Sequence, residues 1–294
     1  RETEPASWTL TPLRTISVYW NIMKRNGLRM KISETIIVRG AGDIATGTIY
    51  RLYKAGFRVI VLDIEAPTVI RRTVAFAQAI QDGMAVVEDV AARRCESIEE
   101  VCYCLKKGEI PVCVDPKGDM IRMVRPDAVV DAILAKKNLG TTRDMAKAVI
   151  ALGPGFTAKE DVDAVIETNR GHHLGRILYE GMAARNTGIP GNIGGYTHER
   201  VIHAPDSGTI RLCHDIGDLV KKDECLALIG ETPVISKLDG VLRGMIADGT
   251  SVKKGLKIAD VDPRGDIAYC YTISDKARNI SGGVLEAVMY LLKE

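Results

Sequence analysis

The stretch Thr35–Gly47 limits the fold more than any other part of the chain, because it joins an apolar strand to a glycine-rich turn and then to a helix. Gly40 and Gly42 allow a tight turn whose backbone can approach a diphosphate. Ala45 supplies the small third position of the pattern G-x-G-x-x-G/A. We therefore predict a nucleotide-binding turn that opens a helix at Asp43.

The helix is predicted to run over Asp43–Ala55, and a second apolar strand follows at Val59–Leu62. That strand ends on Asp63, about 20 residues beyond the turn, where a carboxylate would meet ribose hydroxyls. Asp63 disfavours a 2′-phosphate, and Arg71 and Arg72 are placed to offset that preference. The expected cofactor is NAD(P) or another nucleotide.

Asp43 opposes this interpretation. A carboxylate at the amino terminus of a helix suits the helix dipole, but it repels a phosphate at the same place. The alternative is a scaffold that keeps the strand, turn and helix without a ligand, since a fold alone does not imply a function. Both interpretations predict the same local backbone.

Composition narrows the class of protein. With 294 residues and 46% hydrophobic content, the chain is long enough for two globular domains. A formal net charge of +2 and the lack of a dense basic run give no indication of nucleic acid as a partner. Seven cysteines without a pairing pattern favour a reducing compartment, so we expect a cytoplasmic protein. No apolar run is long enough for a signal peptide or a membrane span, so no membrane partner is expected.

The first 29 residues differ from the rest. They contain both tryptophans, Trp8 and Trp20, and their apolar residues show no clear helical or strand periodicity. Met30 stands directly before the first predicted strand. We expect residues 1–29 to be an extension that is not native to the domain. A short amphipathic helix around Ser17–Met23 is the alternative.

Strands and helices alternate from Lys31 to about Leu152, which is typical of a mainly parallel sheet covered on both faces. A capping box at Ser97–Glu100 predicts a helix that ends at Gly108. We therefore expect a Rossmann-like α/β domain over residues 30–195. Its further strands are predicted at Val112–Val114, Ala128–Leu134 and Ala148–Leu152.

A second turn with small residues follows the strand that ends at Leu152. Gly153 and Gly155 lie there, at a carboxyl end of the sheet, and we expect them to form part of the cofactor site. The next residues, Thr157–Glu160, match a capping box, which predicts a helix as far as Asn169. The glycine-rich segment Asn186–Gly195 marks the domain boundary.

Beyond that boundary, a pattern repeats after about 32 residues. Pro205–Lys222 and Lys237–Lys254 share a spacing of glycine, valine and a lysine doublet. We expect the two halves to form a small all-β barrel over residues 196–264, similar to the barrel-sandwich hybrid of biotinyl and lipoyl domains. The segment that joins them, Gly230–Ser236, has no lysine, so neither biotin nor lipoate is expected. Residues 265–294 should add a helix that packs back on the α/β domain.

From Met30 to the carboxyl end, the chain resembles the accessory proteins of selenium-dependent molybdenum hydroxylase systems, which are related to xanthine dehydrogenase accessory factors. The resemblance depends on a combination of motifs: Val38–Gly47, Leu152–Thr157, Asn186–Gly195, the duplicated barrel and the helix at Gly282–Gly283. It implies a bacterial maturation factor that binds a nucleotide or the molybdenum cofactor. Its partner would be a molybdenum hydroxylase or the machinery that assembles its cofactor. The resemblance transfers the nucleotide turn, as Gly40, Gly42, Ala45 and Asp63, and no catalytic residue.

Two other functions stay open at this point. One is an NAD(P)-dependent oxidoreductase that holds its substrate through Arg170, His172 and His173. The other is a non-catalytic adaptor whose nucleotide turn is vestigial, so the sequence leaves open whether the protein is an enzyme.

Four basic residues are candidates for anion binding: Arg39, Arg170, His172 and His173. No paired Cys/His spacing predicts a metal site. Cys95 follows two arginines and is the candidate for a thiolate of lowered pKa.

Overall fold

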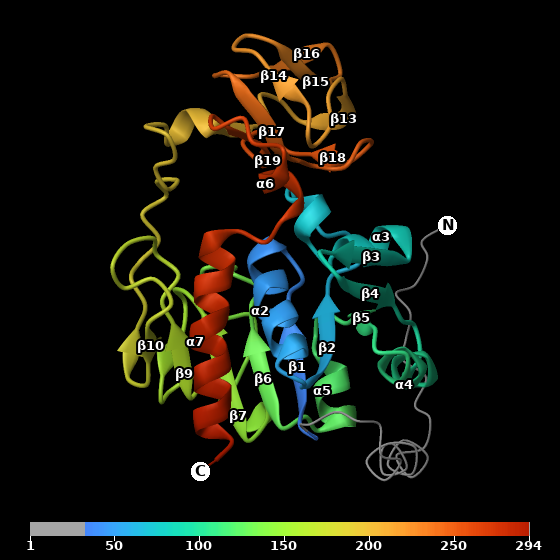
Figure 1. Ribbon diagram of the computed structural model, residues 1–294, viewed down its shortest axis with the longest axis vertical. Coiled ribbons are helices and arrows are strands. Elements are labelled where there is room, and N and C mark those ends of the chain that lie inside the picture. Colours follow the sequence, from blue (N-terminus) through green and yellow to red (C-terminus); the bar gives the residue numbers. More distant parts are fainter. Residues whose placement is uncertain (1–32, 294) are drawn as a thin grey trace.

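The computed structural model describes residues 33–293, so the predictions for residues 1–29 lie outside the described part of the chain. Figure 1 shows two bodies, a large sheet covered by helices and a distal all-β unit, joined by residues 185–195 and by the segment that leads into the last helix.

Nine strands form the large sheet, in the order β10-β9-β7-β6-β1-β2-β5-β4-β3. Neighbours from β9 to β4 run parallel, whereas β10 and β3 pair antiparallel at the two edges. The strands span Thr35–Arg39 (β1), Arg58–Asp63 (β2), Met84–Val87 (β3), Val90–Arg94 (β4), Ile110–Val114 (β5), Ala128–Asp131 (β6), Ala148–Leu152 (β7), Ala164–Ile166 (β9) and Ile177–Leu178 (β10).

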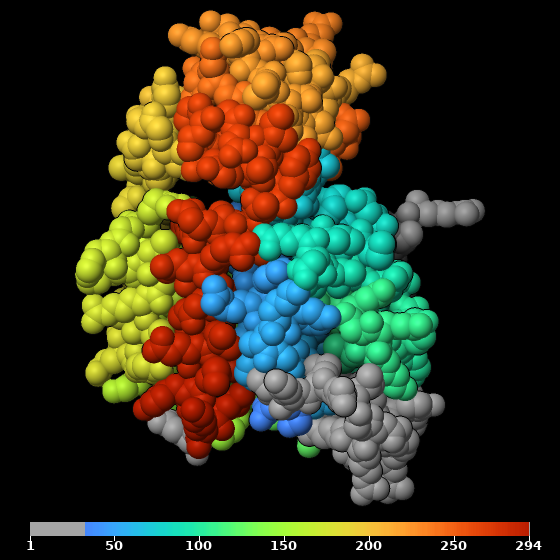
Figure 2. Space-filling model, in the orientation of Figure 1, coloured from blue at the N-terminus to red at the C-terminus, as the bar shows by residue number. Residues whose placement is uncertain are grey.

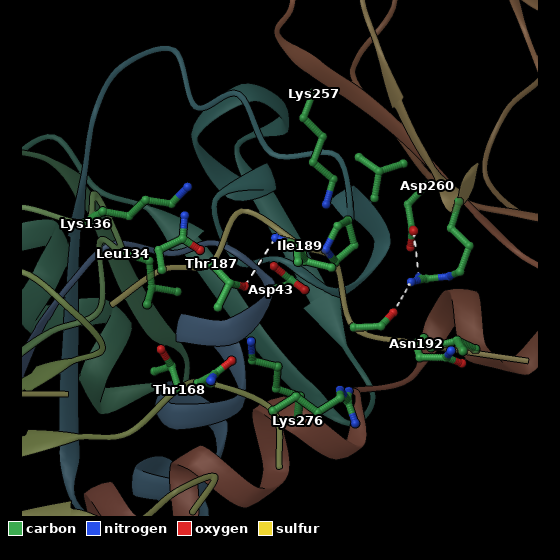
Figure 3. A pocket seen from close by; sticks show the side chains of 18 of the residues that line it. Asp43, Leu134, Lys136, Thr168, Thr187, Ile189, Asn192, Lys257, Asp260 and Lys276 are labelled. Carbon is green, nitrogen blue, oxygen red and sulfur yellow. Dashed lines mark hydrogen bonds and ion pairs between the residues drawn. The ribbon is translucent and has the colours of Figure 1, made fainter. Parts of the chain in front are cut away.

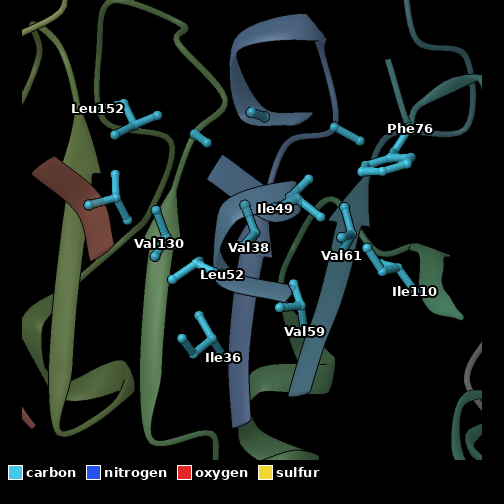
Figure 4. Close-up of a cluster of buried hydrophobic side chains, with 14 of the residues drawn as sticks. Ile36, Val38, Ile49, Leu52, Val59, Val61, Phe76, Ile110, Val130 and Leu152 are labelled. Atoms are coloured by element: carbon cyan, nitrogen blue, oxygen red, sulfur yellow. The ribbon is translucent and has the colours of Figure 1, made fainter. Parts of the chain in front are cut away.

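Helices cover both faces of this sheet because its strands are apolar on both faces. Ile36 and Val38 of β1 lie in the cluster under the helices α2 and α7, which Figure 4 shows, whereas Ile37 points into the cluster on the other face. No helix of residues 33–293 is both long enough and apolar enough to cross a bilayer. The helices span Asp43–Lys54 (α2), Gln78–Asp82 (α3), Ile98–Lys106 (α4), Asp119–Val124 (α5), Ala268–Tyr271 (α6) and Asp275–Leu291 (α7).

The turn between β1 and α2 has the backbone that its glycines predict. Gly40 has φ +94°, and a Cβ there would lie 2.8 Å from the carbonyl oxygen of Ala132 after β6. Only glycine fits a left-handed conformation and so close an approach. The helix begins at Asp43, as predicted, and Gly42 at its N-cap has no side chain to bond the first N–H groups.

The helix predicted over Thr157–Asn169 is wrong. Its first residues form the short strand β8 (Thr157–Ala158), which pairs with β11 (Gly181–Met182), and the following residues turn back into β9. The backbone N–H of Thr157 donates to Asp161, at 2.7 Å, so the capping signal closes a turn. The run of residues 164–166 is buried throughout, which favours a central strand.

The distal unit consists of two four-stranded antiparallel sheets, in the orders β12-β19-β17-β14 and β16-β15-β13-β18. Their inner faces share one apolar core, which includes Ile210, Leu226 and Val241. The strands span Val201–His203 (β12), Gly208–Leu212 (β13), Leu219–Val220 (β14), Cys225–Ile229 (β15), Thr232–Ile235 (β16), Gly240–Met245 (β17), Ser251–Val252 (β18) and Lys257–Asp262 (β19).

The predicted fold class, a Rossmann-like sheet with a barrel-sandwich hybrid domain, is therefore wrong. The large sheet is mixed, with an antiparallel strand at each edge, and the distal strands divide between two separate antiparallel sheets. The sequence repeat gave the wrong prediction because it shows only that the two halves have equivalent turns. It does not show which sheet each strand joins: β13 and β17 begin the two halves, yet they lie in different sheets.

Helices α2 and α7 pack side by side on one face of the large sheet, and both begin at the end that faces the distal unit (Figure 1). Their contact is closest at Gly47 of α2, where a Cβ would lie 2.7 Å from the Cβ of Ala277 and 2.9 Å from its carbonyl oxygen. This contact fixes the two helix starts, at Asp43 and Asp275, beside each other.

We expect Gly47→Ala to lower the free energy of unfolding by about 1–3 kcal/mol, because the added methyl group overpacks a backbone contact. Urea denaturation measures the change. The matched control is Gly282→Ala in α7, where a Cβ meets nothing within 4 Å. The control should be neutral or stabilise by up to about 1 kcal/mol, as alanine favours a helix. Equal stabilities of the two variants would contradict the close packing.

Candidate functional site: a basic cavity

A half-open cavity of about 910 Å³ separates the large sheet from the distal unit. Figure 2 shows the surface hollowed between residues 185–195, the start of α7 and the distal sheets. The near wall comes from segments that follow β1, β2, β6, β7 and β9, at the carboxyl ends of these parallel strands. Strand β1 lies between β2 and β6, so the order of the chain reverses there, where open α/β sheets place ligands.

Positive charge dominates the lining of this cavity. Eight lining side chains are basic and two, Asp43 and Asp260, are acidic. Polar groups of the linking segment, such as Asn186 and Asn192, close one side, and Figure 3 shows how the walls converge. The basic residues are Arg71, Lys136, Arg170, Arg185, Arg200, Arg243, Lys257 and Lys276.

Some of the basic residues on the distal wall pair with aspartates of the same wall. Arg200 donates to Asp260 at 2.8 Å, and Arg243 bonds the other oxygen of the same carboxylate. Arg243 also lies 3.1 Å from Asp262, which binds Arg264. Three arginines thus share two buried carboxylates, and the network keeps a positive charge.

Arg71 lies in the segment after β2 and reaches the same wall. It is 5% exposed, and its Nη2 donates to the carbonyl oxygen of Tyr269 at 2.8 Å. Its Nε has no hydrogen-bond partner in the described part of the chain. Burial lowers the pKa of Arg71, and the neighbouring Arg243 acts in the same direction. A buried guanidinium with an unused donor is costly unless a ligand completes its bonds.

The start of α7 forms the floor. Arg170 holds Asp275 through two bonds, of 2.6 and 3.1 Å. This bond to Arg170 lowers the pKa of Asp275 to about 2. The side-chain amine of Lys276, the next residue, makes no ion pair or hydrogen bond within residues 33–293, and burial lowers its pKa.

The predicted nucleotide turn lies beside this cavity, and of the residues predicted to bind the nucleotide there only Asp43 lines it; Gly40, Gly42, Ala45 and Asp63 do not. The side chain of Asp63 accepts hydrogen bonds from the N–H groups of Ala41, at 2.8 Å, and Ile64, at 2.7 Å. Burial raises the pKa of this carboxyl. Asp63 therefore holds the turn in place, and its oxygens do not face the cavity.

Gly153 and Gly155, also predicted to form part of the cofactor site, make close backbone contacts. Gly153 has φ +77°, and a Cβ there would lie 2.6 Å from Thr168 Oγ1; at Gly155 a Cβ would lie 2.6 Å from the backbone nitrogen of Lys137. These glycines let the segments after β6, β7 and β9 pack together, while Pro154 between them lines the cavity.

Of the predicted anion-binding residues, only Arg170 lines the cavity; Arg39, His172 and His173 do not. Arg39 is buried, donates to Thr141 Oγ1 at 2.5 Å and lies 3.8 Å from Asp131. His172 and His173 are exposed and stack edge to face, with ring centroids 5.1 Å apart.

Cys95 is a core thiol and not an exposed thiolate beside cations. It is 1% exposed, and its Sγ donates to the carbonyl oxygen of Arg93 at 3.6 Å. Its closeness to Cys104 raises the pKa of that second thiol. Within residues 33–293, no three His, Cys, Asp or Glu side chains are placed to hold a metal ion.

The basic residues that the distal unit contributes to the cavity were not predicted from the sequence. Arg200, Arg243 and Lys257 come from strands or turns of the distal unit, and their patterns resemble those of exposed basic residues. Lys276 lies in the first turn of α7, whose N-cap is Ser274, and it was not singled out from the sequence. The one available signal was Arg71, whose position after β2 suggested a phosphate contact.

No family model matches this chain. One curated relative is an uncharacterized protein, YqeB, of Escherichia coli (strain K12), 54% identical over 273 residues. The match covers 91% of this chain and 50% of the relative, so the chain spans half of that protein's length.

Two solved structures were also compared. One is a succinylglutamate desuccinylase/aspartoacylase from Rhodobacter sphaeroides, with 13% identity, 78% of this chain and 84% of that chain covered, and a TM-score of 0.24. The other is the ectoine utilization protein EutE (DoeB) from Ruegeria pomeroyi, with 12% identity, 78% and 85% covered, and a TM-score of 0.24. Likeness at this level carries no argument about function.

These comparisons correct the resemblance inferred from the sequence. The relative is an uncharacterized protein, and no family model matches this chain. The expected membership is wrong, and so is the maturation function that it implied. The nicotinamide oxidoreductase and the adaptor with a vestigial turn are not supported either. The partner expected from the resemblance has no other support, and the exclusion of nucleic acid and membrane stays a prediction.

We expect Arg170→Gln to raise the pKa of Asp275 from about 2 toward 3.8, because the guanidinium that stabilises the carboxylate is removed. The native pKa is depressed, so this pair stabilises the fold above pH 4 and loses that effect as the pH falls toward 2. Carboxyl carbon NMR titration measures the shift. Arg185→Gln is the control and should leave Asp275 unchanged.

Proposed function

We propose that the protein binds a small organic molecule with at least two negative charges, phosphate or carboxylate, in the basic cavity. The observation that carries this proposal is the excess of basic over acidic side chains around one concave space, eight against two. Asp260, Asp262 and Asp275 already pair with three of these arginines. The positive charge that remains is unfavourable without a further counter-ion, because like charges in a partly buried space repel one another.

The unused donors support a ligand with directed oxygen atoms. Arg71 is 5% exposed and has an Nε without a partner, and Arg200 is 4% exposed with the same feature. Planar guanidinium groups bind carboxylate or phosphate through parallel bonds, which are stronger than neutral hydrogen bonds. Both residues line the cavity, so a ligand bound there would lie beside both guanidinium groups.

The volume supports a metabolite and not a lone inorganic ion. A cavity of about 910 Å³ lies in the range of small-molecule sites, which is about 300–1,000 Å³. Apolar residues such as Ile70, Leu134 and Ile189 line part of it, so the ligand is expected to carry carbon surface besides its charges. We further propose that the protein acts in the cytoplasm, where its seven free cysteines would stay reduced.

We expect inorganic pyrophosphate and citrate to raise the melting temperature and to bind measurably by calorimetry, with inorganic phosphate weaker than either. Arg71→Met keeps the aliphatic stem and removes the charge, so it should weaken pyrophosphate binding about 10- to 100-fold, as loss of a charge-assisted bond costs about 1.5–3 kcal/mol.

The control is Lys222→Met on the distal unit, an exposed lysine outside the cavity, which should bind like the unaltered protein. Arg185→Gln provides a second test, because Arg185 is exposed and its removal does not threaten folding. The proposal is wrong if none of the three anions binds, or if the cavity variants and the control bind them equally.

A further inference from the structure

Lys276 has surroundings unlike those of the other lysines that line the cavity. Lys136 and Lys257 are exposed, whereas Lys276 is partly buried at the cavity floor. Its side-chain amine makes no hydrogen bond or ion pair with residues 33–293. Figure 3 shows it facing the same space as Asp43.

The backbone also disfavours a charge on this amine. Lys276 is the second residue of α7, whose N-cap is Ser274, and the amino terminus of a helix carries partial positive charge. The close contact of Gly47 with Ala277 brings the start of α2 to the same place, so two helix termini of equal sign meet there. Arg170, in the segment after β9, adds a third positive group and is paired with Asp275.

The charged groups that act on Lys276 come from several elements. Burial is the largest influence and lowers its pKa; Arg170 and Lys257 act in the same direction. Asp43 and Glu167 act in the opposite direction without reversing the shift. A desolvated lysine beside another cation is the environment in which amines serve as nucleophiles at neutral pH.

We propose that Lys276 is the reactive amine of the cavity and forms an imine with an anionic aldehyde or ketone. This inference rests on the proposed function, because the arginines would hold the anionic group while the carbonyl carbon meets the amine. It makes the cavity a site of covalent chemistry and not of binding alone.

The step needs no other reactant. The neutral amine adds to the carbonyl carbon, and the resulting carbinolamine loses the former carbonyl oxygen as water. Both protons of the amine leave in that water, and a C=N bond remains. Asp43 faces the same space and has no partner for its carboxylate within residues 33–293, so it is placed to carry protons between nitrogen and oxygen.

Pyridoxal 5′-phosphate is a suitable probe, because it combines an aldehyde with a phosphate. We expect it to give an imine absorbance and, after borohydride reduction, a single modified peptide that contains Lys276. Pyridoxal, which lacks the phosphate, should label at least about tenfold less, equivalent to about 1.4 kcal/mol of lost binding. Pyrophosphate should protect Lys276 from labelling.

Matched variants separate this inference from the proposed function. Lys276→Arg keeps a basic side chain and removes the nucleophilic amine, so it should bind pyrophosphate yet form no adduct. Lys222→Arg, on the distal unit and outside the cavity, should keep the full adduct at Lys276.

The inference is wrong if the label is spread over exposed lysines and the Lys276→Arg variant is labelled to the same yield. In that case, pyrophosphate binding would still support the proposed anion-binding function of the cavity. Failure of pyrophosphate, citrate and phosphate to bind at all would instead refute the proposed function. A faster reaction as the pH rises through neutrality, lost in Lys276→Arg, would further support the amine.

Discussion

Unbalanced positive charge between the two bodies is the constraint on which the candidate site depends. Asp260 and Asp262 hold three arginines on the distal wall, and Asp275 holds Arg170 on the floor. These carboxylates fix the directions of the guanidinium groups without neutralising the cavity. Charges that are oriented in advance bind an anion with little loss of side-chain entropy. The same pairing explains why a surface so basic is compatible with a folded chain.

Much of the large sheet could be predicted from local pattern. The strand at Ile36–Val38, the helix from Asp43 and the strand at Ala148–Leu152 are where the sequence places them, because their apolar periods and glycine turns are strong signals. The helix predicted from Thr157 was wrong, since a capping pattern also suits a turn. The burial of the residues that follow favoured a strand there. The pairing of the distal strands depends on contacts distant in sequence, which a repeat of turns does not encode.

The candidate site was predicted only in part, for a related reason. Asp43, Arg170 and Arg71 were singled out, and all three line the cavity. The turn glycines and Asp63 were assigned to a ligand, yet they serve the backbone: Gly40 permits a close approach to Ala132, and Asp63 holds Ala41. Lys276 and Arg243 belong to the site because of their burial and of neighbours in the other body. A short sequence motif encodes neither property.

The cavity takes its walls from both bodies, and this has a mechanical consequence. A guest that touches Arg71 on one side and Arg200 on the other would tie the large sheet to the distal sheets, besides filling the hollow between them. Direct bonds already join the bodies, since the N–H of Met245 donates to the carbonyl oxygen of Ile70 and Arg72 donates to that of Met245. A bound guest would add its interaction energy to these bonds and lose it when either body opens, so it would couple the unfolding of the two bodies more tightly.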